Sequence, residues 1–355
     1  MNIIHALRRY RRPINITIKA LVVLLLSWVL YRNVLTSEEA VRIKAAFLNA
    51  IGLEQLPWLI ICVLLMPVNW GLESAKWQAL AARIERTSYG RAYQAILAGV
   101  TLSLFTPNRV GEYGGRILMV KSDHNWRAVV ATMVGYISQW IPLLGIGTTG
   151  LLWTLYSHSN VNYYVLSGVM VIGFSFTLWW LVCYFRVSSV LPLLMRIKWL
   201  RKYITHLEVL RKYRRHELVR ILALSICRYS VYVTQYYLVL RFFGVEVGLL
   251  QGLAGASAIF IIQTSIPLPP VVSVVMRGEV ALFVFGPYGA NELSILASTY
   301  SLWMLNLILP ALAGLVVIIR ANVLRSLVDL DSTPPTTKAT PTTTATTTTE
   351  EPAQL

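Results

Sequence analysis

The sequence has few charged residues, few cysteines and few histidines. Asp, Glu, Lys and Arg make up only 14% of its 355 residues, whereas hydrophobic residues make up 56%. Because about a quarter of an ordinary soluble domain is charged, this composition excludes that class. The three cysteines (Cys62, Cys183 and Cys227) are far apart, which excludes a disulfide framework and a CxxC metal site. The five histidines form no HxxxH or HExxH pattern, so no metal site is predicted.

Acidic residues are also scarce relative to basic ones. The chain has 16 acids against 32 lysines and arginines, for a net charge of +16. The bases cluster beside apolar runs, which favours the positive-inside rule and anionic inner-leaflet lipids over nucleic acid as the partner. A P-loop of the form GxxxxGK[ST] is missing, which excludes that mode of nucleotide binding.

Long apolar runs predict an all-α, polytopic integral membrane protein. A helix needs about 20 apolar residues to cross a hydrocarbon core of about 30 Å. The basic residues place the N-terminus, 1–15, and the stretch from Lys76 to Arg91 on the cytoplasmic side, and 36–54 is predicted to be an external loop. The predicted spans are 16–35, 55–72, 128–156, 163–185, 218–240 and 293–319.

A proline-broken segment interrupts the first membrane half, 16–185. The apolar run that begins at Ala92 is too short for a full crossing. Thr106 and Pro107 then supply the N-cap and first position of a new helix. We therefore predict a re-entrant hairpin at about 92–120, with Gly111 also in its turn. A full crossing that places Lys121 outside is the alternative.

A similar break lies in the second membrane half, 217–325, after a basic amphipathic connector at 186–216. This second hairpin is predicted at about 249–286, with its turn at Pro267, Pro269 and Pro270. Paired broken segments in two halves are a sequence signature of a transporter site, and they suggest two pseudo-repeats of inverted topology. The Thr- and Pro-rich tail, 326–355, is predicted to be disordered.

The first hairpin carries the candidate binding chemistry. Arg109, Glu112 and Arg116 share one helix face, and Glu112 can pair with Arg116. Arg109 is then left at a helix start, which favours an anion. Its planar fork suits phosphate. Gly111 and the glycines that follow it allow the close approach of another helix or a ligand.

The second hairpin can supply Arg277 as a further cation and Glu279 as a further acid. Three arginines against two acids leave a positive surplus, which favours an anionic ligand. The alternative is that these charges only neutralise each other and hold broken helices together. Tyr136 and Trp140 are candidates to line a lipid path, although aromatic residues in spans more often belong to the core or to the interface.

These motifs resemble those of a known family. The run TPNRVGEYGGR, from Thr106 to Arg116, is similar to the TPGRVGE-type signature of flippase-like membrane proteins typified by the transmembrane region of lysylphosphatidylglycerol synthases. The run IPLPP at 266–270, followed by Arg277 and Glu279, resembles that family's second motif. Hydropathy and motif order agree over about residues 10–325.

The sequence departs from the family pattern at two positions. Asn108 stands where glycine is common, and Gly278 separates the arginine of the second motif from its glutamate. The resemblance implies movement of a phospholipid or polyprenyl lipid between leaflets, without enzymatic activity or a cofactor. It also implies a bacterial or archaeal cytoplasmic membrane. Because only the threonine tail follows Arg325, we expect another protein to make the lipid.

Two other functional classes stay open. One is a membrane-embedded enzyme that acts on lipid phosphates, although no His/Asp cluster offers a nucleophile or a metal site. The other is a non-transporting scaffold that binds a separate lipid-modifying enzyme through the connector at 186–216. A second copy of the chain is a further candidate partner.

Overall fold

The computed structural model describes residues 11–31, 38–104, 106, 109–120, 125–158, 161–186, 208–266 and 274–320. Within these ranges every regular element is helical, as predicted. The α-helices are α2 (Arg11–Leu30), α3 (Glu38–Ala50), α4 (Leu56–Ala81), α5 (Tyr89–Ser103), α6 (Gly111–Ile117), α7 (Asn125–His158), α8 (Tyr163–Phe185), α11 (Arg215–Phe242), α12 (Leu249–Thr264), α13 (Val274–Phe285), α14 (Glu292–Trp303) and α15 (Leu309–Arg320). Short 3-10 helices, η5 (Glu208–Lys212) and η6 (Gly286–Tyr288), and a π-helix, η7 (Met304–Ile308), complete the described elements.

Four helical stretches are long and apolar enough to cross a membrane. They are α4, α7, α8 and the continuous run from Glu292 to Arg320, which joins α14, η7 and α15. Their number confirms the prediction of a polytopic membrane protein. Of the predicted connector at 186–216, residues 187–207 lie outside the described residues, and its end forms η5 and the start of α11. The tail at 326–355 also lies outside them.

Two predictions about the second span and its flanks were wrong. The external loop predicted at 36–54 contains the helix α3, because Ile43, Phe47 and Ala50 recur at helical spacing and pack against the core around α11. The second span continues past 72 to the end of α4. Lys76 is therefore 2% exposed within the helix instead of marking the inner face.

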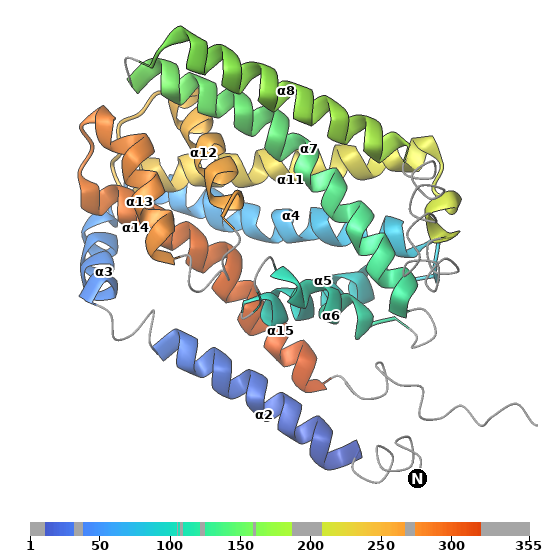
Figure 1. Cartoon of the computed structure of the whole chain (residues 1–355). Coiled ribbons are helices and arrows are strands. Elements are labelled where there is room, and N and C mark those ends of the chain that lie inside the picture. The colour runs from blue at the N-terminus through green and yellow to red at the C-terminus, as the bar shows by residue number, and fades with distance from the viewer. Residues whose placement is uncertain are drawn as a thin grey trace, which may run out of the picture.

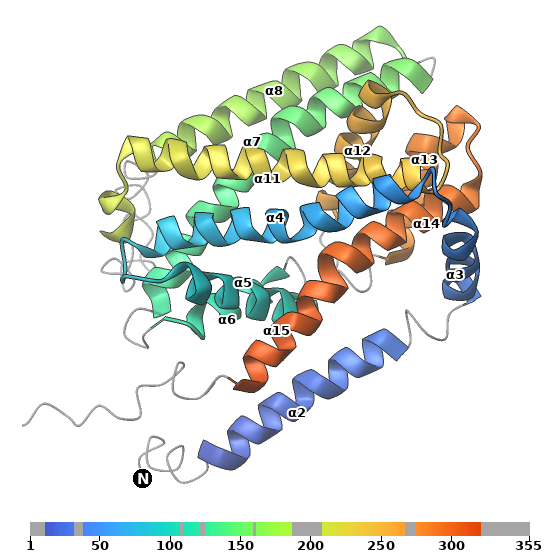
Figure 2. The same ribbon diagram turned by 180° about the vertical axis from the view of Figure 1, so that it is seen from behind.

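The helices pack around a central pair, α4 and α11, which lie side by side in both views (Figures 1 and 2). Helix α12 packs against α7, and α8 lies on the outer side of α7 (Figure 1). Helix α15 packs against α5 and also contacts α2 at the edge of the molecule. In this arrangement, the first broken segment packs against α4 through α5, and the second packs against α11 through α12.

Both broken segments form helix hairpins, as predicted. Helix α5 packs against α6, and α12 packs against α13. Thr106 lies at the first turn, where its side-chain oxygen accepts a hydrogen bond from the Gly111 backbone N–H at 2.8 Å. Of the other predicted turn residues, Pro107, Pro267, Pro269 and Pro270 lie outside the described residues. Their re-entrant placement in a bilayer stays a prediction.

Glycines bring α5 and α6 into backbone contact. A Cβ at Gly115 would lie 2.0 Å from the Gly99 nitrogen, and one at Gly111 would lie 2.2 Å from the Leu102 carbonyl oxygen. No side chain larger than hydrogen fits at either position. The prediction that these glycines allow close helix approach is therefore confirmed, and the tight contact fixes α6 and the residues that precede it.

We expect the variant Gly115→Ala to be clearly less stable than the wild-type protein. The new methyl group would overlap the backbone of α5, and overpacking of this kind costs about 1–3 kcal/mol. Thermal unfolding of the detergent-purified protein measures the effect. Gly90→Ala is the matched control because a Cβ at Gly90, on the same hairpin, meets nothing within 4 Å. Equal melting temperatures for the two variants would contradict the prediction.

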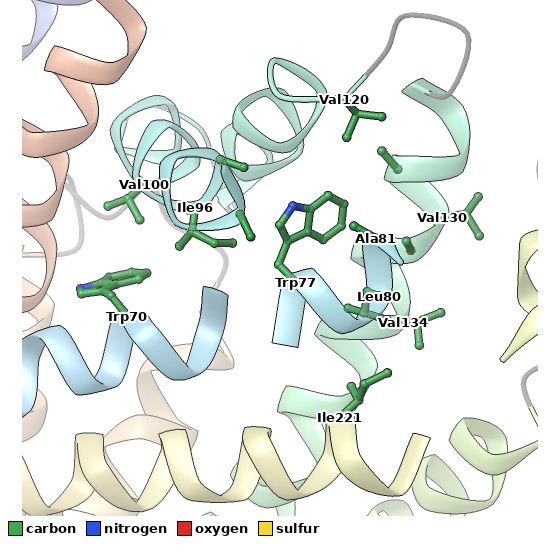
Figure 3. Close-up of a cluster of buried hydrophobic side chains, with 14 of the residues drawn as sticks. Trp70, Trp77, Leu80, Ala81, Ile96, Val100, Val120, Val130, Val134 and Ile221 are labelled. Atoms are coloured by element: carbon green, nitrogen blue, oxygen red, sulfur yellow. The ribbon is translucent and has the colours of Figure 1, made fainter. Parts of the chain in front are cut away.

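The hydrophobic core beneath the first hairpin is built on large side chains of α4. Figure 3 shows Trp77 pointing from α4 into the space between the first hairpin and α7, with Leu80 and Val134 beside it. Trp70 lies further along α4 and faces Ile96 and Val100 of α5 (Figure 3). The core thus holds the first hairpin on α4. Polar residues of α4 that lie between its apolar core residues contribute to the site described below.

Candidate functional site

A cavity of about 660 Å³ lies between the two hairpins and the central helices. Its size falls within the range of small-ligand sites. Residues from both hairpins and from α4, α7, α11 and the α14–η7 stretch line it. The lining residues are Asn69, Trp70, Arg109, Tyr113, Tyr136, Gln139, Trp140, Leu143, Arg228, Tyr229, Tyr232, Phe260, Gln263, Thr264, Ser265, Ile266, Arg277, Trp303, Asn306 and Leu307.

Three arginines from three separate segments line this cavity. Arg109 precedes α6 in the first hairpin, Arg277 lies on α13 in the second, and Arg228 lies on α11. No Asp or Glu belongs to the lining among the described residues. The structure therefore brings together the two arginines that the sequence predicted, and it adds Arg228.

Arg109 is held by its backbone and by an ion pair. Its φ of 57° lies in the left-handed region, which is unfavourable for a side chain with a Cβ. Its Nε lies 2.7 Å from Oε1 of Glu112. The prediction that Arg109 stands unpaired in the first helical turn was wrong, because α6 begins only at Gly111 and Glu112 reaches back to Arg109.

Glu73 on α4 is the centre of a buried ion network behind the cavity. Its carboxylate lies 2.7 Å from Lys76 Nζ, 2.9 Å from Arg116 Nη2 and 3.3 Å from Arg228 Nη1. The Glu73 and Arg116 side chains are only about one-twentieth exposed. Sequence reasoning missed Glu73, although its i,i+3 spacing to Lys76 within an apolar helix was a usable signal.

Glu112 completes the network on the side of the first hairpin. It lies 3.4 Å from Arg116 Nη2, and its Oε2 accepts a hydrogen bond from the Tyr136 hydroxyl at 2.7 Å. The Arg116 guanidinium also lies over the rings of Trp77 and Tyr136. Both carboxylates of the network are therefore engaged by groups of the protein itself.

The charges do not balance. The network and the cavity wall together hold two carboxylates, Glu73 and Glu112, against five cations. Those cations are Lys76, Arg109, Arg116, Arg228 and Arg277. The surplus is positive and faces the cavity, so the arrangement favours an anion there.

The second hairpin contributes Arg277, and the contacts of this side chain include an amide. Arg277 Nη1 donates a hydrogen bond to Gln263 Oε1, at the end of α12, at 3.2 Å. Arg109 and Arg277 thus line the same cavity from the two hairpins. Their role in binding an anion stays a prediction.

Two other predicted site residues lie elsewhere. Glu279 is exposed and is not among the residues that line the cavity. Gly278 turns inward instead, where a Cβ would meet Leu296 and the Tyr300 hydroxyl. Arg116 is not among the residues that line the cavity, and it contacts the site through Glu112, Glu73 and the ring of Tyr136.

A neutral polar group lies at one side of the cavity, and we call it the Asn–Trp floor. It consists of Asn69, Trp70, Trp303 and Asn306, all of them at least 95% buried. The Asn69 side-chain amide donates to Asn306 Oδ1 at 3.1 Å. The π-helix η7 includes Asn306 and begins directly after Trp303. Such π-bulges are frequent at functional sites.

The described residues contain no cluster of three or more His, Cys, Asp or Glu side chains that is placed to hold a metal ion. The lining chemistry is instead that of a polar, cationic and aromatic binding cavity. Comparison with known proteins is consistent with a membrane site. The model of the family described as "Lysylphosphatidylglycerol synthase TM region" matches residues 16–314. No curated protein and no solved structure matches the chain.

Proposed function

We propose that this chain, which belongs to the family of the lysylphosphatidylglycerol synthase transmembrane region, binds a membrane-lipid headgroup in the cavity and moves that lipid between leaflets. Family membership makes it a membrane protein of lipid metabolism or transport. The proposal adds that the lipid is held by its phosphate and that transport is passive or coupled to an ion gradient. The headgroup is that of an anionic, an aminoacylated or a polyprenyl-linked lipid.

The observation that carries the proposal is the set of arginines around the cavity. Arg109, Arg228 and Arg277 converge on one space from three segments, and no carboxylate lines that space among the described residues. Arginine donates two parallel hydrogen bonds to a phosphate. Ionisable groups within a membrane are costly and mark substrate paths. A purely structural network would be expected to neutralise its cations, whereas this one leaves a surplus.

The position of the cavity supports movement of a lipid through the bilayer. It lies between the ends of two broken helical segments, one in each half of the chain. Non-helical backbone is tolerated at membrane depth only where protein or a polar cavity covers it. Transporters that alternate between two sides place their sites at such paired breaks. Glu112 orients Arg109, and Glu279 has no part in the proposed site.

The proposal assigns no catalysis to this chain, and the transported lipid is made by another protein. The membrane is proposed to be the cytoplasmic membrane of a bacterium or an archaeon. If the chain instead anchors a lipid-modifying enzyme without moving lipid, the assay below gives no protein-dependent translocation.

The proposed function is tested by headgroup accessibility in liposomes. Vesicles that contain the purified protein and a labelled phospholipid in one leaflet are mixed with a membrane-impermeant quencher. We expect the wild-type protein to accelerate exchange between leaflets and Arg109→Ala to reduce this acceleration at least tenfold, because one charge-assisted phosphate contact is worth about 1.5–3 kcal/mol.

Two controls make this assay decisive. The double variant Arg109→Ala/Glu112→Gln removes the carboxylate that loses its partner, so it separates loss of binding from a stranded charge. Arg186→Ala alters an exposed arginine at the end of α8 and should translocate normally. Unimpaired exchange in Arg109→Ala, or no exchange with the wild-type protein, contradicts the proposal.

A further inference from the structure

We infer that the cavity takes a lipid headgroup that offers acceptor oxygens on two sides, a phosphate to the arginines and hydroxyl groups to the Asn–Trp floor, and that it rejects a headgroup bearing an ammonium group. This inference rests on the proposed function and narrows its substrate class to anionic phospholipids whose headgroup is an uncharged polyol.

The described lining of the cavity offers no carboxylate that could receive an ammonium group. Among the described residues that line the cavity there is no Asp or Glu. The two nearby carboxylates are already engaged, Glu73 by three cations and Glu112 by two arginines and the Tyr136 hydroxyl. A cationic headgroup would therefore meet arginines without a compensating acid, and juxtaposed like charges are unfavourable.

The Asn–Trp floor contains buried hydrogen-bond donors that lack an acceptor. The indole N–H groups of Trp70 and Trp303 and the side-chain amide nitrogen of Asn306 are buried, and none of them has an acceptor in the protein. Buried polar groups without partners are costly, so each such group in a native structure calls for an explanation. A headgroup that carries acceptor oxygens would satisfy these donors once the floor side chains turn them toward the cavity, because the three atoms have almost no accessible surface in the empty protein.

The chemistry of the Asn–Trp floor distinguishes a hydroxyl group from a bare phosphate oxygen. The floor also contains one buried acceptor without a donor, Oδ1 of Asn69. A hydroxyl group both donates and accepts, so a polyol can satisfy Asn69 together with the indole donors of Trp70 and Trp303. A phosphate oxygen can only accept, and an ammonium group can only donate. The mixed chemistry of the floor thus matches a polyol best.

The geometry lets both parts of one headgroup bind together. Trp70 lies in the floor and also under the Arg228 guanidinium, whose carbon is 5.3 Å from the ring centroid. Arg228 in turn belongs to the cationic side of the cavity. In one headgroup, the phosphate and the hydroxyl groups are separated by only a few covalent bonds. The Arg228–Trp70 contact places the arginines and the Asn–Trp floor next to each other, so both can bind the same headgroup.

The test measures which lipids remain bound to the purified protein by native mass spectrometry. The protein is mixed with equal amounts of phosphatidylglycerol, phosphatidic acid, phosphatidylethanolamine and lysylphosphatidylglycerol. We expect phosphatidylglycerol to be retained at least about tenfold better than the two ammonium-bearing lipids. We also expect it to be retained better than phosphatidic acid, which has a phosphate but no polyol.

The variant Trp303→Phe tests the floor. It keeps an aromatic ring and removes the unsatisfied indole N–H, but it also shortens a buried side chain, so some stability is lost and the lipid preference is the readout. We expect it to lose the preference for phosphatidylglycerol over phosphatidic acid. Trp179→Phe, at an exposed position on α8, is the matched control and should keep that preference.

The outcomes separate the inference from the function on which it rests. Equal or stronger retention of lysylphosphatidylglycerol or phosphatidylethanolamine overturns the inference and leaves lipid binding intact. An unchanged preference in Trp303→Phe overturns the role of the floor. If the wild-type protein retains no phospholipid whose loss follows Arg109→Ala, the proposed function itself fails.

Discussion

Replacement of Glu73 by glutamine is expected to destabilise the protein by about 3–5 kcal/mol, because the change leaves buried cations without their shared partner. The Glu73 carboxylate holds Lys76, Arg116 and Arg228, and the first two of these side chains are almost completely buried. Glutamine has nearly the same shape but no charge. The measurement is the thermal unfolding midpoint of the protein in a single detergent.

The second-site variant Lys76→Met shows whether unpaired charge is the cause. In the Glu73→Gln background it removes one of the stranded cations and should recover part of the lost stability. Glu246→Gln, at an exposed position between α11 and α12, is the matched control and should unfold like the wild-type protein. If Glu73→Gln unfolds at the wild-type temperature, the buried network does not hold the fold together.

Replacement of Arg277 by glutamine is expected to have the opposite pattern, with lost binding and preserved stability. Arg277 lines the cavity and is not part of the buried ion network centred on Glu73, so its removal leaves that network intact. Binding of an anionic phospholipid should weaken by about 10–150-fold, the value of one charged hydrogen-bonding contact. Lipid titration and thermal unfolding of the same preparation measure both effects.

Two further variants sharpen this result. Arg277→Lys keeps the charge but loses the planar fork, so binding should be intermediate. Arg241→Gln is the matched control, because Arg241 lies over Trp58 away from the cavity lining. Full lipid affinity in Arg277→Gln would show that the second hairpin contributes no cation to the site.

The two hairpins and their arginines could be predicted because their signals are local. The first hairpin is indicated within about 30 residues of sequence by a short apolar run, a Thr-Pro pair and a following polar segment. The structure places Arg109 and Arg277 at one cavity, as expected. The close glycine contacts of Gly111 and Gly115 follow from the same segment. Short-range patterns therefore located the site.

The ion network could not be predicted because its partners lie far apart in the sequence. Glu73 meets Arg116 from the first hairpin and Arg228 from α11, and only the packing of α4 between them creates the contacts. Glu73 and Glu112 compete for Arg116, which explains how Glu112 pairs. Since Glu73 takes Arg116 at the shorter distance, Glu112 lies closer to Arg109 than to its helical neighbour.

The helix α3 was missed for a different reason. Glu38, Arg42 and Lys44 give the segment 36–54 the polar composition of a loop. The apolar residues that recur at helical spacing pack against α11, where Phe47 lies 5.4 Å from Phe242 between ring centroids. Tertiary packing of one face thus decides the structure of a segment whose composition resembles a loop.

The contact between α4 and α11 is fastened by polar bonds at three levels. Arg83 pairs with Glu217 near one end, Glu73 with Arg228 at the middle, and the Gln235 side chain donates to the Cys62 carbonyl at the other end. At about 1.5 Å per residue, the stretch from Cys62 to Arg83 is about 30 Å long, the thickness of a hydrocarbon core.

These three polar contacts are spread along α4 and α11 and hold the two helices together. Sliding one helix against the other would break all three contacts. If the proposed lipid movement opens the cavity, we therefore expect α4 and α11 to stay fixed relative to each other, as the frame against which the neighbouring helices move.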